Sequence, residues 1–275
     1  MTQIMVKQIV CAFILLVVSI SATAVSDERL RRFIGSDTRT EVYAARDVYR
    51  HPQATLEFFQ VRATDTVVEI WPGGGWYAEI LGPWLNAEGS YYAAHFSPAM
   101  EKAFFLNSRE RFQKKLVSAS NLYGNAKLTS FYPPSGRPSA PAGSADKVLT
   151  FRNVHNWLKA GYAESAFQEF YIVLKPGGIL GVVEHRAKPG TSLEDMNTSG
   201  YVTEAKVKQL AEQAGLEFVA SSEINANPKD TTDHPRGVWT LPPSLRLGDE
   251  NRDYYLSIGE SDRMTLMFRK PEPSN

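Results

Sequence analysis

The chain has 275 residues, of which 43% are hydrophobic and 22% are charged. These proportions are typical of a globular protein and exclude a disordered, collagenous or disulfide-stapled chain. Thirty lysines and arginines balance thirty aspartates and glutamates, so the formal net charge is zero. Nucleic-acid-binding proteins usually carry an excess of basic residues, so we expect no nucleic-acid partner.

Residues 1–24 have the pattern of a secretion signal peptide. Lys7 is their only charged residue, Ile9–Val18 is a ten-residue apolar run, and Ala22-Thr23-Ala24 is a small-residue cleavage site. The run is short for a bilayer span. Cleavage would also remove Cys11, the only cysteine, and a cysteine-free chain suits an oxidising compartment. We therefore expect a periplasmic or secreted bacterial protein with no stable membrane span after cleavage. The alternative is an uncleaved N-terminal anchor.

Residues 25–60 follow as an N-terminal helical segment. We expect a break near His51-Pro52, because the residue before a proline disfavours the helical conformation. Arg50, just before this break, is expected at an exposed helix end, although it could also close over a site.

Strand and helix patterns alternate through residues 61–275, which we expect to form one domain. Gly82-Pro83 should end or kink the first helix. A stretch rich in proline and charge, about residues 225–252, is an insertion that could serve as a lid or an interface. Strands are predicted over residues 66–70, 91–96, 127–131, 147–151, 179–184, 216–224 and 264–269. The longer helices are predicted over residues 76–85, 98–119, 163–174 and 203–214.

This alternation predicts an α/β fold with a doubly wound, mainly parallel sheet and helices on both faces. Ligands bind such sheets beyond the carboxyl ends of the strands, at the switch point beside the first strand. In this chain the switch point falls at the run Glu69–Tyr77, EIWPGGGWY. Gly73 and Gly75 allow close approach of the backbone and positive φ angles. Glu69 ends a buried strand, so its carboxylate needs a partner from the loop or from a ligand.

The glycine run has two interpretations. Gly73-x-Gly75-x-x-Ala78 matches the dinucleotide fingerprint G-x-G-x-x-A, which alone is a weak signal for a nicotinamide oxidoreductase. Glu69-x-Trp71-x-Gly73-x-Gly75 resembles the first motif of class I S-adenosylmethionine-dependent methyltransferases, with Trp71 in place of the first glycine.

Further segments strengthen the resemblance to these methyltransferases. Residues 146–155 resemble the family's fourth-strand motif, and residues 174–180 resemble the turn into its fifth strand. The resemblance covers about residues 40–270 and is closest to a group of exported, predicted methyltransferases that carry the EIWPGGGWY run. It implies a Rossmann-like sheet of seven strands whose last strand is antiparallel, and S-adenosylmethionine as the cofactor.

The resemblance also implies the cofactor-binding residues. These are Glu69, Trp71, Gly73, Gly74, Gly75 and His95. His95 stands where the family usually has an acidic residue, at the end of the second strand, that accepts hydrogen bonds from the ribose. An acidic residue that helps to read the adenine commonly follows the third strand, but residues 130–133 contain none. The missing acid after the glycine run also counts against a nicotinamide dehydrogenase.

Polar residues after the fourth predicted strand are the candidate catalytic groups. Methyl transfer needs mainly alignment of a nucleophile with the methyl group, because the cofactor carries the activated methyl. We expect Asn153 to position the substrate and His155 to act as a base or a substrate contact. The alternative for His155 is a helix cap or a bond to the backbone.

We expect no metal ion, because the histidines show no HxH or HExxH spacing, although His95, His155 and His185 all follow strands at one edge. The sequence thus predicts an S-adenosylmethionine-dependent methyltransferase with a small-molecule substrate. The alternative is a non-catalytic or differently specific protein that binds a small ligand on the same fold.

Overall fold

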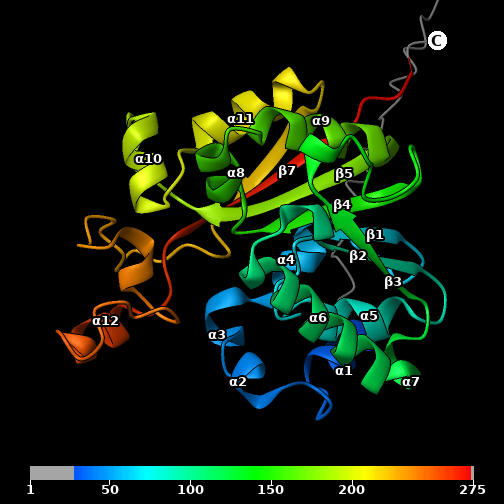
Figure 1. Ribbon diagram of the computed structural model, residues 1–275, viewed down its shortest axis with the longest axis horizontal. Helices are drawn as coiled ribbons and strands as arrows, with labels where there is room; N and C mark the ends of the chain where they lie inside the picture. The colour runs from blue at the N-terminus through cyan, green and yellow to red at the C-terminus, as the bar shows by residue number, and fades with distance from the viewer. Residues whose placement is uncertain (1–27, 274–275) are drawn as a thin grey trace, which may run out of the picture.

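The computed structural model describes residues 28–273, so the predicted signal peptide lies outside the described residues. A seven-stranded sheet with the order β3-β2-β1-β4-β5-β7-β6 forms its centre (Figure 1). β1 to β5 are parallel, and β7 is antiparallel to both of its neighbours. This confirms the predicted α/β fold and its antiparallel last strand. The strands are β1 (Thr66–Ile70), β2 (Ser90–Phe96), β3 (Ala126–Phe131), β4 (Ala145–Phe151), β5 (Leu174–His185), β6 (Glu217–Ser222) and β7 (Arg263–Arg269).

Helices cover both faces of the sheet (Figure 1). Apolar residues of α8, α9 and α11 pack on one face, and those of α1, α4, α5 and α6 pack on the other. No helix among residues 28–273 is long and apolar enough to cross a bilayer. The helices are α1 (Glu28–Ile34), α2 (Glu41–Ala44), α3 (Asp47–Arg50), α4 (Pro52–Phe58), α5 (Ala78–Leu85), α6 (Ala103–Ser118), α7 (Ser120–Tyr123), α8 (Val154–Ala160), α9 (Ala163–Val173), α10 (Leu193–Ser199), α11 (Glu204–Gln213) and α12 (Arg252–Ile258).

Two of the predicted helices differ from those in the structure. α5 continues through Gly82-Pro83 to Leu85, because Pro83 lies in its last turn and so interrupts little of the helix. The helix predicted over 98–119 is divided. A 3-10 turn over Pro98–Met100 precedes α6, and Glu101 between them has a left-handed backbone with φ 57°.

The break predicted at His51-Pro52 is confirmed. His51 has a left-handed backbone with φ 41° and separates α3 from α4, and Pro52 occupies the first turn of α4. Proline suits that position because the first turn of a helix lacks acceptors for its N–H groups. Arg50, the last residue of α3 before this turn, is only 4% exposed. The expectation that Arg50 lies at an exposed helix end is therefore wrong.

The antiparallel strand brings a late segment of the chain to the edge where the parallel strands end. An antiparallel strand begins where its parallel neighbour finishes, and Arg263 at the start of β7 pairs with His185 at the end of β5. Residues 259–262 consequently meet the carboxyl ends of β4 and β5. Part of the insertion predicted over 225–252, the 3-10 turn Gly237–Thr240, also packs against α10 near this edge.

A glycine in the middle of β5 sets how closely Phe59, the residue after α4, approaches the sheet. A Cβ atom added at Gly181 would lie 2.7 Å from the Phe59 ring and 2.8 Å from Leu149. Both neighbours are fully buried, so neither has free space into which it can move.

We predict that Gly181→Ala lowers the free energy of unfolding by about 1–3 kcal/mol through overpacking. Urea unfolding measures this loss. Phe59→Leu is the matched second change, because it trims the side chain that the new methyl group meets. The double variant should lose less stability than the sum of the two single variants. Strict additivity would show that Phe59 is not the limiting contact.

Candidate functional site

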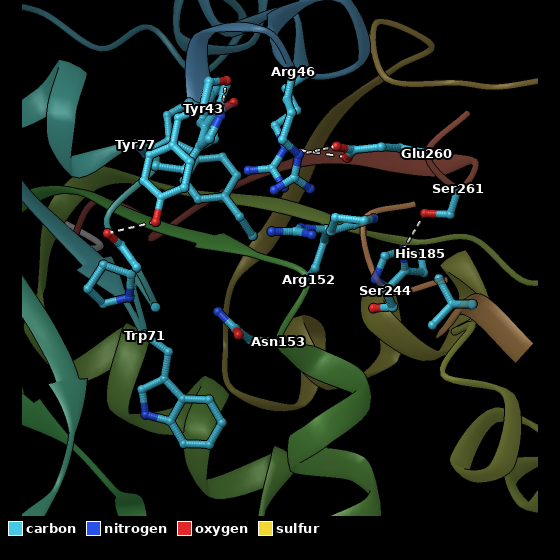
Figure 2. Close-up of a pocket in the computed structure, with 18 of the residues that line it drawn as sticks. Tyr43, Arg46, Trp71, Tyr77, Arg152, Asn153, His185, Ser244, Glu260 and Ser261 are labelled. Atoms are coloured by element: carbon cyan, nitrogen blue, oxygen red, sulfur yellow. Dashed lines mark hydrogen bonds and ion pairs between the residues drawn. The ribbon is translucent and has the colours of Figure 1, made fainter. Parts of the chain in front are cut away.

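A cavity of about 300 Å³ opens at the carboxyl ends of β1, β4 and β5. Four further parts of the chain complete its walls: the α2–α3 region, the glycine run, the insertion and the loop before β7 (Figure 2). This is the switch point at which the sequence predicts a ligand. The lining residues that bear on its chemistry are Tyr43, Arg46, Arg50, Glu69, Trp71, Gly73, Gly74, Arg152, Asn153, His155, His185, Trp239, Ser244, Glu260 and Ser261.

The glycine run forms the tight turn that its sequence predicts. Gly73 and Gly75 have φ angles of 59° and 91°, which other residues rarely adopt. A Cβ atom at Gly73 would have no neighbour within 4 Å, so the turn leaves open space there. At Gly74 an added Cβ would collide with the Tyr43 hydroxyl, which donates a hydrogen bond of 3.2 Å to the Gly74 carbonyl. The N-terminal helical segment thus rests directly on the turn.

Glu69 has an internal partner. The Tyr91 hydroxyl donates a hydrogen bond of 2.6 Å to its carboxyl group, and the side chain is 3% exposed. The parallel register explains the contact, since Tyr91 lies opposite Val67, two residues before Glu69 on the same side of β1. Burial raises the pKa of Glu69 to about 7, although the Tyr91 hydrogen bond opposes this shift. The carboxyl group is therefore partly protonated at neutral pH.

Trp71 occupies the position of the missing motif glycine and takes a glycine-like backbone with φ 49°. Its indole Nε1 donates a hydrogen bond of 2.9 Å to the Phe131 carbonyl, at the end of β3. The ring also packs edge-on against Phe96, Phe131 and Trp157. The indole thus fills the space between the ends of β2 and β3, where the family resemblance puts the contacts to the nucleoside.

His95 does not line the cavity. Its Nδ1 accepts a hydrogen bond of 2.8 Å from the Phe96 amide, so the proton lies on Nε2, 3.0 Å from the Gly73 carbonyl. Burial lowers the pKa of His95 to about 4, which keeps the ring neutral. Both ring nitrogens therefore bind the backbone, and they tie the end of β2 to the glycine turn.

Asn153 and His155 both face the cavity, as the sequence predicts. Asn153 Nδ2 donates to the Ile70 carbonyl at 2.9 Å and to Thr150 Oγ1 at 3.3 Å, which ties the ends of β1 and β4 together. Its side-chain oxygen has no hydrogen-bond partner among residues 28–273 and can accept from a ligand.

The His155 ring contacts a carboxylate rather than capping the helix. Its Nδ1 lies 3.0 Å from a Glu184 oxygen. Glu184 is fully buried and also accepts from the backbone amides of His155 and His185, at 3.2 and 2.8 Å. With the Nδ1 proton directed to Glu184, the His155 Nε2 atom of a neutral ring can accept a proton.

The structure brings His155 and His185 together with Glu184, and leaves His95 elsewhere. One possible ligand atom from each of these three residues lies within 4.8 Å of the others, as a metal site requires. His185 Nδ1 is, however, 2.5 Å from Ser261 Oγ. Burial, the nearby His155 and the Arg152 guanidinium lower the pKa of His185 well below its usual value. The positive charge of the surrounding guanidinium groups opposes a bound cation here.

Of the arginines at this site, only Arg50 is singled out from the sequence, as a residue that could close over a site. Arg46 and Arg50 bind Glu260 at 2.5 and 3.4 Å, and Arg263 binds it at 2.8 Å. Arg152 follows β4 directly, and its left-handed backbone, with φ 62°, is the only local sign that it is unusual. Glu260 belongs to no motif, so only the antiparallel pairing of β7 could have predicted its place.

Comparison with solved structures shows the same fold. A S-adenosylmethionine-dependent methyltransferase from Aquifex aeolicus has a TM-score of 0.55 at 14% identity, covering 82% of this chain and 93% of the other. The [4+2]-cyclase SpnF has a TM-score of 0.57 at 16% identity, covering 87% and 86%. The YcgJ protein from Bacillus subtilis has a TM-score of 0.52 at 14% identity, covering 82% and 99%.

The structural overlap at these low identities shows a shared fold, that of the class I methyltransferases. A methyltransferase and a cyclase both share it, so the fold alone leaves the reaction open. No family model and no curated protein matches the chain.

We predict that Glu69→Gln gains stability over the original chain as the pH rises from 5 to 8. The folded pKa of about 7 exceeds the ordinary glutamate value of 4.5, so the original chain binds more protons when folded and loses stability as the pH rises between these values. Between pH 5 and pH 8, the free energy of unfolding of the variant should rise relative to that of the original chain by on the order of 2 kcal/mol. Thermal unfolding across this range measures it, with the exposed Glu101→Gln as control. A gain that does not change with pH would contradict the assignment.

Proposed function

We propose that the protein is a S-adenosylmethionine-dependent methyltransferase whose substrate is a small molecule. The observation that carries this proposal is the cavity itself, which opens beside the Gly73 turn at the carboxyl ends of β1 and β4. A fold shared with methyltransferases and a glycine turn of the matching sequence support the same activity. The N-terminal pattern of residues 1–24 supports export to the periplasm, which is part of the proposal.

The cavity offers different surroundings at its two ends. The rings of Trp71 and Phe96 border one end and suit a flat base, which would lie on the cavity side of the indole. The open space at Gly73 and the free oxygen of Asn153 lie in the same wall. These are the residues that would hold S-adenosylmethionine, which supplies an activated methyl group when it is bound.

The chain itself supplies alignment, a proton acceptor and exclusion of water. His155, held by Glu184, is the group that can take a proton from a substrate nucleophile. Trp239 and the Pro242-Pro243 pair of the insertion also line the cavity. This position fits the role of a lid that keeps water from the reacting groups.

A second candidate is a ligand-binding protein that has kept the fold without the cofactor. Trp71 and His95 favour it, because the indole fills the nucleoside position and both His95 nitrogens bind the backbone. The two candidates differ in one measurable property, which is affinity for the cofactor.

Isothermal titration calorimetry of the purified protein with S-adenosylmethionine and S-adenosylhomocysteine tests the proposal. We expect saturable one-to-one binding. Gly73→Leu should weaken it by at least about tenfold, because the new side chain enters the open space beside the turn.

Gly143→Leu is the matched control for Gly73→Leu. Gly143 has a φ of 60°, close to that of Gly73, and also has open space around an added Cβ, but it does not line the cavity. Its substitution should cost similar stability and leave cofactor affinity unchanged. Absence of binding by the original chain to either ligand would favour the second candidate.

A further inference from the structure

Arg152 is a half-buried cation that forms no ion pair within the described part of the chain. Its side chain forms no hydrogen bond or ion pair with any of residues 28–273. Figure 2 shows it in the middle of the cavity, with Arg46 on one side and Asn153 on the other. Burial lowers the pKa of Arg152 to about 10, so the guanidinium stays charged at neutral pH. A charge in such surroundings is costly unless a partner neutralises it.

The other charged groups at this end of the cavity do not neutralise Arg152. Arg46, Arg50 and Arg263 already share the single carboxylate of Glu260. With Arg152 the balance is four positive charges against one, an excess of three. Counting buried Glu184, which accepts from His155 and His185, as a second negative charge still leaves an excess of two.

Two more guanidinium groups present unused donors at the same place. The Nη2 atoms of Arg46 and Arg50 are buried and have no hydrogen-bond partner. Both residues line the cavity, and Arg50 is held over the Trp76 ring at 4.7 Å from its centroid. That stacking holds the Arg50 guanidinium in a set position. Three arginines that line one cavity therefore carry N–H groups without a hydrogen-bond partner among the described residues.

We propose that this end of the cavity binds the carboxylate or phosphate group of a small anionic ligand, with Arg152 as its principal contact. A planar guanidinium matches the paired oxygens of both groups. Ser244 and Asn153, in the same cavity, can contact the rest of the ligand. The further conclusion that this ligand is the methyl acceptor, and that the acceptor is therefore acidic, rests on the proposed function. The anion site itself does not depend on methyl transfer.

Thermal unfolding with inorganic phosphate and with acetate, at constant ionic strength set by chloride, tests the proposal. A bound anion stabilises the folded state, so at least one probe should raise Tm saturably, by about 2–4 °C at concentrations a few times its Kd. A response to phosphate alone indicates a phosphorylated ligand, and a response to acetate alone indicates a carboxylic acid.

Arg152→Gln separates a binding role from a structural one. Without added anion at low ionic strength, this variant should have a Tm equal to or above that of the original chain, because it removes a cation from a positive cluster. It should also lose the response to either probe. Arg111→Gln, on the exposed surface of α6, is the matched control and should keep the full response.

The proposal is overturned if neither probe raises Tm, or if the rise persists in Arg152→Gln. A lowered Tm of Arg152→Gln in anion-free buffer would also contradict it, because it would mean that Arg152 stabilises the fold. Calorimetry with S-adenosylmethionine in phosphate-free buffer is read separately. Cofactor binding without an anion response refutes the anion site alone, whereas an anion response without cofactor binding refutes the methyltransferase alone.

Discussion

The carboxylate of Glu260 is the interaction on which the arrangement of the site depends. It joins Arg46, 214 positions earlier in the chain, to Arg50 and to Arg263 at the start of β7. Burial raises the pKa of this carboxyl group, but the surrounding arginines outweigh burial and bring the pKa to about 2. Glu260 is therefore ionised at any physiological pH, and it holds the N-terminal helices over the end of the sheet. Without it, Arg46, Arg50 and Arg263 would lose the ion-pair partner that they share.

The same cluster gives the cavity its chemical character. The carboxylate of Glu260 forms ion pairs with three arginines, but its single negative charge does not neutralise them. Arg152 lines the same cavity and forms no ion pair with any of residues 28–273. The opposite end of the cavity is built of rings and of the glycine turn. The aromatic end suits the flat base of the cofactor, and the cationic end suits an acidic methyl acceptor. The two proposals therefore describe two ends of one site.

The elements that repeat a local pattern could be predicted from the sequence, and those that depend on long-range pairing could not. The β-branched run Thr66–Ile70 and the glycines after it predict the switch point, which the structure confirms. Asn153 and His155 follow β4 and do face the cavity. Glu260 carries no local signal, because its place comes from the antiparallel pairing of β5 with β7. The environments of Trp71 and His95 depend on the ends of β2 and β3, which no local pattern describes.

Trp71 and His95 also show how this chain differs from the pattern it resembles. Both bind backbone atoms, Trp71 at the end of β3 and His95 at the end of β2 and in the glycine turn, while arginines line the cavity. A crystal structure of the protein soaked with selenate, an anomalous scatterer that resembles phosphate, tests this account most directly. We predict an anomalous peak in the cavity, with oxygen atoms about 2.7–3.2 Å from the Arg152 guanidinium. A cavity without selenate, in which Arg152 instead pairs with Glu260 or Glu184, would contradict the account.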